Sequence, residues 1–216
     1  MPAKGEIIVS TTSPPRSSAS PDGRLDAPAR FNLNLNPAHW GVQTLAEIGI
    51  AIALAAVLGQ LRLFVMPQGG SVSLELLPIV FVAVRSGVVP ALTAGFLYGL
   101  VQLLLPGAFV YHPVQAVLDY PLAFMALALA GLVLVRGWRT LALAVALAVA
   151  GRLVFHFLSG LIFFAEYAPA WEAPWLYAIT YNLLYLVPEG VLTILLLWPL
   201  LKAHDAAFPG RQRRLA

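Results

Sequence analysis

The chain has 216 residues, of which 60% are hydrophobic and 11% are charged, a balance that excludes an ordinary soluble domain and indicates a membrane protein. The formal net charge of +3 comes from basic residues at the ends of apolar runs that form no continuous patch, so no nucleic-acid partner is expected. Cysteine is absent, which excludes a disulfide framework and a cysteine-based metal site.

The first 38 residues differ in composition from the rest of the chain. The stretch STTSPPRSSASPDGRLDAPAR is rich in Ser, Pro and charged residues and has too little apolar surface to offset the entropy of ordering. We therefore expect a disordered cytoplasmic tail over residues 1–38. The apolar run EIIV near its start is too short to be the core of a signal peptide.

The rest of the chain contains apolar stretches that can cross a membrane, which takes roughly 20 helical residues, or fewer where protein shelters the ends. Six such helices are predicted, with short turns containing Gly or Pro between most of them. They run over residues 42–65, 72–87, 89–105, 113–135, 139–165 and 174–201. The sequence thus predicts an all-α membrane protein, with a compact six-helix domain over residues 39–204 and a basic cytoplasmic tail over 205–216.

The Lys and Arg residues predict the orientation, because cytoplasmic loops carry an excess of both. With the N-terminus in the cytoplasm, most basic residues lie inside: Lys4, Arg16, Arg24, Arg30, Arg85, Arg136, Arg139, Lys202, Arg211, Arg213 and Arg214. The exceptions are Arg62, near the outer end of the first helix, and Arg152, within the fifth. We therefore expect both termini in the cytoplasm.

Polar residues from four helices fall at one depth in the outer half of the membrane. From the helical rise, Asp119 lies roughly 9 Å below the outer end of the fourth helix, and His156 roughly 12 Å below that of the fifth. Asn182 is at a similar depth on the sixth helix, whereas Tyr177 and Glu75 lie nearer the outer surface. Each residue alone is also compatible with an interhelical hydrogen bond. Because ionisable groups avoid lipid, their agreement in depth predicts a cavity that opens outward.

Arg152, His156 and Gly160 recur at four-residue spacing and therefore share one helical stripe, which Phe164 extends. Gly160 leaves room for a ligand ring or for another helix, and Phe164 can stack on a ring. Arg152 is one turn deeper, where a structural ion pair with a carboxylate is expected. Glu189 is the candidate partner.

The first predicted helix carries small residues at four-residue spacing. Ala51 and Ala55 form one such pair, with Gly49/Ala53 and Ala55/Gly59 offset around it. Surfaces of this kind allow another helix to approach closely.

Four segments resemble the substrate-binding S component of the energy-coupling factor (ECF) thiamine transporters. They are SLELLPIVFVAVRSGVVPALTAGFLYGL, HPVQAVLDYPLAFMALALAGL, GRLVFHFLSGLIFFAEYAP and LYAITYN, which cover most of residues 71–182. The resemblance implies a six-helix protein of a prokaryotic plasma membrane that captures thiamine from outside with high affinity. Its implied partners are a transmembrane coupling (T) protein and two cytoplasmic ATPases.

The resemblance also implies roles for individual residues. The substrate-binding positions of the family fall on Asp119, Tyr120, His156, Gly160, Phe164, Tyr177 and Asn182, and its alanine-rich docking helix corresponds to Ala51 and Ala55. Thiamine combines a cationic thiazolium with an aminopyrimidine, so its pocket needs negative charge, aromatic faces and directional hydrogen bonds. Glu75 is expected either to add negative charge to this site or to stand in water at the outer interface.

The sequence departs from the family pattern in three places. The family usually has Glu where Asp119 stands, so this carboxylate reaches one methylene less far. Phe164 replaces a stacking Trp, and a Phe ring is a poorer partner for a cation. The first outer loop, VMPQGG, contains no Trp, whereas the family can supply an aromatic lid there.

The chain contains no G-x-x-x-x-G-K-[ST] phosphate loop, so ATP is expected to be used only by partner subunits. We expect no catalytic residues, no metal site and no cofactor in this chain, with thiamine as its ligand. Two alternatives stay open. The chain is an S component for another vitamin or a thiamine precursor, or it is an intramembrane hydrolase in which Ser159, three residues from His156, acts as nucleophile.

Overall fold

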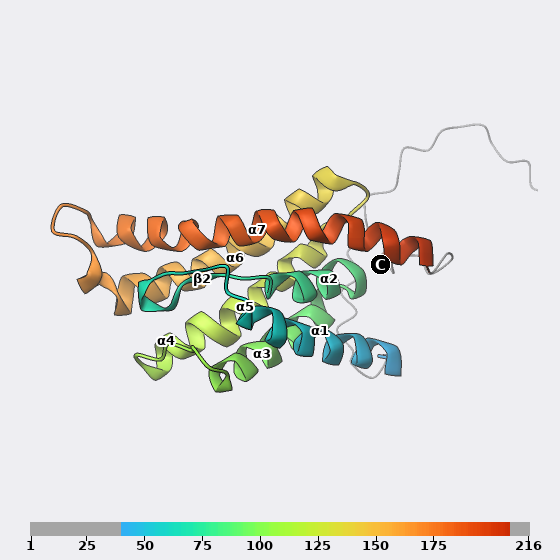
Figure 1. Ribbon diagram of the computed structural model, residues 1–216, viewed down its shortest axis with the longest axis horizontal. Helices are drawn as coiled ribbons and strands as arrows, with labels where there is room; N and C mark the ends of the chain where they lie inside the picture. The colour runs from blue at the N-terminus through green and yellow to red at the C-terminus, as the bar shows by residue number, and fades with distance from the viewer. Residues whose placement is uncertain (1–39, 208–216) are drawn as a thin grey trace, which may run out of the picture. The chain divides into compact units, whose positions relative to one another are not determined.

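The computed structural model describes residues 40–207, and these form six helical segments in the predicted order (Figure 1). The segments are α1 (Val42–Gln60), α2 (Leu76–Ser86), α3 (Val88–Leu104), a composite segment, α6 (Trp138–Phe163) and α7 (Pro174–Ala207). The composite segment consists of α4 (Pro113–Val117), the π-helix η3 (Leu118–Leu122), α5 (Ala123–Met125) and the 3-10 helix η4 (Ala126–Leu132). The predicted tail over 1–38 and residues 208–216 lie outside the described residues.

The predicted all-α, six-helix membrane fold is confirmed, with corrections to three helix ends. By length and composition, α1, the composite segment, α6 and α7 can each cross a membrane, whereas α2 and α3 are apolar but shorter. The first helix ends at Gln60 rather than residue 65, and the second begins at Leu76 rather than residue 72. The last helix continues to Ala207, so the first three residues of the predicted C-terminal tail are helical.

A short antiparallel hairpin accounts for the missing helical turns. Strand β1 (Phe64–Val65) pairs with β2 (Ser71–Val72) around the 3-10 turn η2 (Pro67–Gly69). Left-handed backbone at Gln68 (φ 60°) and Gly69 (φ 95°) closes this turn. The hairpin runs along α7, where the Gly70 N–H donates to the Tyr181 hydroxyl (3.1 Å). The hairpin is covered on one side only: Val72 of β2 is buried, whereas both residues of β1 are exposed.

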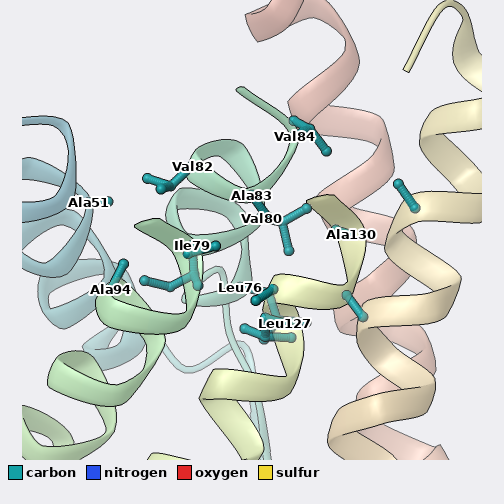
Figure 2. Packing of buried hydrophobic residues seen from close by; sticks show 14 of the residues in the cluster. Ala51, Leu76, Ile79, Val80, Val82, Ala83, Val84, Ala94, Leu127 and Ala130 are labelled. Carbon is teal, nitrogen blue, oxygen red and sulfur yellow. The ribbon is translucent and has the colours of Figure 1, made fainter. Parts of the chain in front are cut away.

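Helix α2 lies at the centre of the apolar core. Figure 2 shows its residues from Leu76 to Val84 between α1, α3 and η4, with Ala51, Ala94 and Leu127 around them. Seven of its eleven residues are buried, which is the pattern of a helix enclosed on all sides rather than one facing lipid.

The predicted docking residues Ala51 and Ala55 belong to this core. Their exposed fractions are 4% and 0%, so they cannot form a surface for a partner in this conformation. Gly49 and Ala53 instead lie on the exposed face of α1. The small residues predicted from their spacing lie on the inner face of α1, where they allow this helix to pack closely against its neighbours in the same chain.

Two glycines of α3, which sequence analysis did not single out, bring this helix against the composite segment. A Cβ added at Gly99 would lie 2.5 Å from the Cα of Pro121, and one added at Gly95 would overlap the carbonyl of Phe124. The Gly95/Gly99 pair therefore sets the position of η3, which carries Asp119.

Polar contacts join α1, α2 and α7 at one end of the bundle. Arg85 Nη2 lies 3.9 Å from Glu47 Oε1, and Arg85 Nη1 lies 3.1 Å from His204 Nδ1. In Figure 1 the start of α1 and the end of α7 lie at this end, opposite the α6–α7 loop. Six membrane-crossing segments place the start of the first and the end of the last on the same side. That this side is the cytoplasm remains a prediction.

We predict that Gly99→Val lowers the melting temperature of the detergent-purified protein by roughly 5 °C or more, because overpacking against Pro121 costs about 1–3 kcal/mol. Gly49→Val is the matched control, since a Cβ there meets nothing within 4 Å and the helix-propensity change is the same. Thermal unfolding followed by tryptophan fluorescence measures both. Equal melting temperatures for the two variants would contradict the close packing of α3 and η3.

Candidate functional site

A cavity open to solvent lies between the hairpin, η3, α6 and α7. About 740 Å³ of space that no protein atom fills, open solvent at the mouth included, lies among its lining residues. All of the predicted substrate-binding residues line it: Glu75, Asp119, Tyr120, His156, Gly160, Phe164, Tyr177 and Asn182. The fold thus brings together in one cavity the residues that the sequence placed on four different helices.

Asp119 lies in the π-helical turn η3, a type of irregularity often found at functional sites. Its Oδ1 lies 3.0 Å from His156 Nδ1. Its Oδ2 accepts hydrogen bonds from Gln115 Nε2 (2.7 Å) and Ser159 Oγ (2.8 Å). The carboxylate is therefore held in place by its own helix and by α6.

The contacts of His156 define its tautomer. Arg152 Nε donates to His156 Nε2 at 3.0 Å, and an arginine nitrogen can only donate. Nε2 must therefore be the acceptor, which leaves the proton on Nδ1, where it is donated to Asp119. A neutral imidazole thus connects the buried guanidinium to the carboxylate at the cavity wall.

Arg152 forms two buried ion pairs. Its Nη1 lies 3.1 Å from Glu189 Oε2, and its Nη2 lies 3.1 Å from Glu75 Oε1. The guanidinium also lies 4.3 Å from the ring centroid of Phe124. The ion pair expected from sequence is present, with Glu189 as partner.

The placement of Glu75 removes one of its two predicted environments. It is 4% exposed, so it is not a carboxylate in water at the outer interface. The hairpin replaces the first turn of the predicted second helix, so Glu75 stands deeper, at the start of α2.

The charges around the cavity do not balance. Glu189 Oε1 accepts from both the N–H and the hydroxyl of Ser73 (2.9 Å each), so this carboxylate acts only as an acceptor. Glu75 and Glu189 both pair with the single guanidinium of Arg152, whereas Asp119 contacts the neutral His156 and no cation, so acidic groups outnumber basic ones at the site. Buried unpaired charge is unfavourable. The site is therefore suited to a cationic ligand.

Aromatic rings form much of the cavity wall. Phe164 lies 6.0 Å from Phe109, measured between ring centroids. On α7, Tyr177, Tyr181 and Tyr185 form a ladder with centroid separations of 5.8 and 6.1 Å. Tyr181 and Tyr185 were not predicted as site residues, although four-residue spacing from Tyr177 places them on the same face of the helix.

Several predicted ligand contacts also hold the protein together. The Tyr120 hydroxyl accepts from the N–H of Phe109 (2.6 Å) and donates to its carbonyl (3.2 Å). Asn182 Nδ2 donates to the carbonyl of Ala178 (2.7 Å). Gly160 allows α6 to approach α7, since a Cβ there would lie 3.1 Å from that of Ala178. These contacts fix the cavity wall.

The arrangement gives no support to a hydrolase. The Ser159 hydroxyl donates to Asp119, and both nitrogens of His156 contact other partners. A serine nucleophile needs a base within hydrogen-bond reach, and here the base is turned to Asp119 and Arg152.

We predict that Arg152→Gln destabilises the protein by about 3–5 kcal/mol, because two buried carboxylates lose their partner. In detergent, the melting temperature should fall by roughly 6 °C or more. Arg139→Gln, an exposed arginine at the start of α6, serves as control and should melt close to the unchanged protein. If the two variants melted alike, the ion pairs would contribute nothing measurable.

Comparison with known proteins adds independent information. A family model described as "Thiamine transporter protein" matches residues 45–209. The chain is 36% identical over 167 residues to Thiamine transporter ThiT of Bacillus subtilis (strain 168), covering 71% of this chain and 87% of that protein. It is 31% identical over 189 residues to Thiamine transporter ThiT of Lacticaseibacillus paracasei, covering 80% and 94%.

A solved structure of ThiT from Listeria monocytogenes matches the fold with a TM-score of 0.70 at 25% sequence identity, covering 76% of this chain and 96% of that chain. The curated relatives are bacterial, are named as transporters rather than enzymes, and match a chain with four helices able to cross a membrane. This is a multi-pass bacterial membrane protein, and the chain belongs to the thiamine transporter protein family.

Proposed function

We propose that this chain is the thiamine-binding S component of an ECF-type importer, which captures the vitamin outside the cell and releases it inside. The observation that carries this proposal is the excess negative charge beside an aromatic wall, in a cavity built around the Arg152–His156–Asp119 chain of hydrogen bonds. The curated relatives are named as thiamine transporters.

The chemistry of thiamine matches this cavity. A permanently cationic thiazolium is attracted to carboxylates and to the faces of aromatic rings. Asp119 supplies negative charge at the cavity wall, and Phe164 and Tyr177 supply rings. His156 and Asn182 contribute polarity, mainly by holding neighbouring groups in fixed directions. Glu75 adds negative charge at the cavity floor, where Arg152 shares it.

We predict that Asp119→Asn weakens thiamine binding roughly 30-fold or more, because it removes a half-buried charge that faces a cation without changing the size of the side chain. Isothermal titration of the detergent-purified protein measures this affinity. Glu166→Gln removes an exposed carboxylate that does not line the cavity, and it should leave the affinity unchanged.

Riboflavin and biotin serve as ligand controls in the same titration. The proposal fails if folded, unaltered protein gives no heat with thiamine. Heat with another vitamin would then indicate that the replacement of Glu by Asp119 and of Trp by Phe164 has changed the substrate.

The proposal includes partners, because the chain has no phosphate loop of its own. A T protein and two cytoplasmic ATPases would supply the energy from ATP hydrolysis. With Ala51 and Ala55 buried, the surface of α1 that remains for the T protein includes Gly49 and Ala53, flanked by exposed Ile50. Small residues there would let a partner helix approach the α1 backbone.

We predict that Ala53→Trp abolishes thiamine uptake by cells while leaving thiamine binding to the purified protein unchanged, because it fills the docking surface far from the cavity. Val154→Trp, at an exposed apolar position on α6, is the control and should transport normally. Uptake of labelled thiamine is measured in cells with and without the ATPases. Uptake that persists after their deletion would refute the energy source proposed here.

A further inference from the structure

Gln102 lies in the last turn of α3 and is one of the residues that line the cavity. Its Nε2 donates to Glu75 Oε2 at 2.8 Å, and the same oxygen accepts from the Tyr98 hydroxyl at 2.7 Å. The other oxygen of Glu75 is paired with Arg152. Gln102 is thus attached to the buried ion-pair network on one side and borders the ligand space on the other.

The direction of the Gln102 amide is defined by its partner. The Glu75 carboxylate, already paired with an arginine, can only accept hydrogen bonds, so the amide nitrogen must face it. The amide oxygen, Oε1, must then point elsewhere. Within residues 40–207, Gln102 Oε1 is the buried side-chain polar atom that has no hydrogen-bond partner.

Other amides around the cavity differ from Gln102 in this respect. Gln115 uses both ends, since its Oε1 accepts from the Tyr111 N–H (2.9 Å) and its Nε2 donates to Asp119 (2.7 Å). Asn182 also uses both, accepting from the Tyr185 hydroxyl (2.6 Å) and donating to a backbone carbonyl. In both residues the amide oxygen and the amide nitrogen are bonded within the protein. In Gln102 only the nitrogen is, and the oxygen has no partner.

A buried acceptor without a partner is unfavourable, and native proteins keep few of them. We propose that Gln102 Oε1 is a ligand-recognition group that accepts a hydrogen bond from an N–H or O–H of the bound molecule. The inference rests on the proposed function, because thiamine offers two such donors, the amine of its pyrimidine and the hydroxyl of its side chain. Gln102 then favours ligands that carry a neutral hydrogen-bond donor at this position, whereas Asp119 favours ligands that carry a positive charge.

The competing explanation is that Gln102 acts only by holding Glu75. Tyr98→Phe separates the two, because Tyr98 and Gln102 donate to the same oxygen of Glu75. Tyr98→Phe removes a donor to Glu75 and no cavity-lining group, whereas Gln102→Met removes a donor to Glu75 together with Oε1. The side chains of Met and Gln are similar in length, so packing is largely kept.

The experiment measures the affinities of the unaltered protein, Tyr98→Phe and Gln102→Met by isothermal titration with three ligands. These are thiamine, an analogue whose pyrimidine amine is replaced by a carbonyl oxygen, and an analogue whose hydroxyl is replaced by hydrogen. Melting temperatures confirm that each variant is folded. If Gln102→Met does not fold, Gln102→Ala, which leaves room for water, takes its place.

We expect Gln102→Met to weaken thiamine binding roughly tenfold. One analogue lacks the donor that Gln102 Oε1 contacts in thiamine, and its affinity should be the same for Gln102→Met as for the unaltered protein. That analogue identifies whether the amine or the hydroxyl is recognised. Tyr98→Phe should change all three affinities by the same small factor. An equal loss for all three ligands in Gln102→Met, or no loss at all, would overturn the inference. If the unaltered protein binds no thiamine, the proposed function itself fails.

Discussion

The site depends on one buried cation. Arg152 joins three parts of the chain that are distant in sequence: its own helix α6, Glu75 at the start of α2 and Glu189 on α7. Such a cluster is stable only where further hydrogen bonds support the ionised groups, because desolvation opposes burial of ions. Here Ser73, Tyr98 and Gln102 supply the additional donors to the two carboxylates. Ser73, the residue after β2, bonds Glu189 and so brings the end of the hairpin against α7.

The same cation orients the groups that face the cavity. Because Arg152 donates to His156, the imidazole presents its proton to Asp119, and the carboxylate is held between α6 and its own helix. These hydrogen bonds are made within the protein, so ligand binding does not need to create them. Affinity gained by preorganisation of this kind comes from avoiding the entropy of ordering side chains on binding. The ion-pair network below the cavity and the directional contacts at its wall are thus one physical system.

Hydropathy and the energetic cost of buried charge were enough to predict the number of helices, their order and the convergence of Asp119, His156 and Asn182 on one cavity. The hairpin was not predicted, because β1 ends the apolar run of the first predicted helix and β2 begins the apolar run that continues through VSLELL into α2. Small-residue spacing identified Ala51 and Ala55, but spacing alone cannot distinguish the inner face of a helix from the outer one.

Gln102 was missed for a different reason. It is an uncharged residue near a helix end, so hydropathy and charge did not mark it, and its role depends on how its two amide atoms are oriented. That orientation is a consequence of Glu75, and Glu75 is deep only because of the hairpin. Residues whose function depends on tertiary hydrogen bonding cannot be read from periodicity.

The shorter carboxylate at position 119 changes how the site can recognise a ligand. Asp119 accepts from His156, Gln115 and Ser159, so its oxygens are directed towards the protein as much as towards the cavity. A carboxylate held in this way acts on a cation mainly through its field, which attracts any cation of suitable size. A field has little directional specificity, so discrimination among cationic ligands must come from groups with defined direction. The ladder of tyrosines on α7 and the oxygen of Gln102 have that property, and all of them line the cavity. Selectivity in this chain is therefore carried by neutral groups that a charged network holds in place.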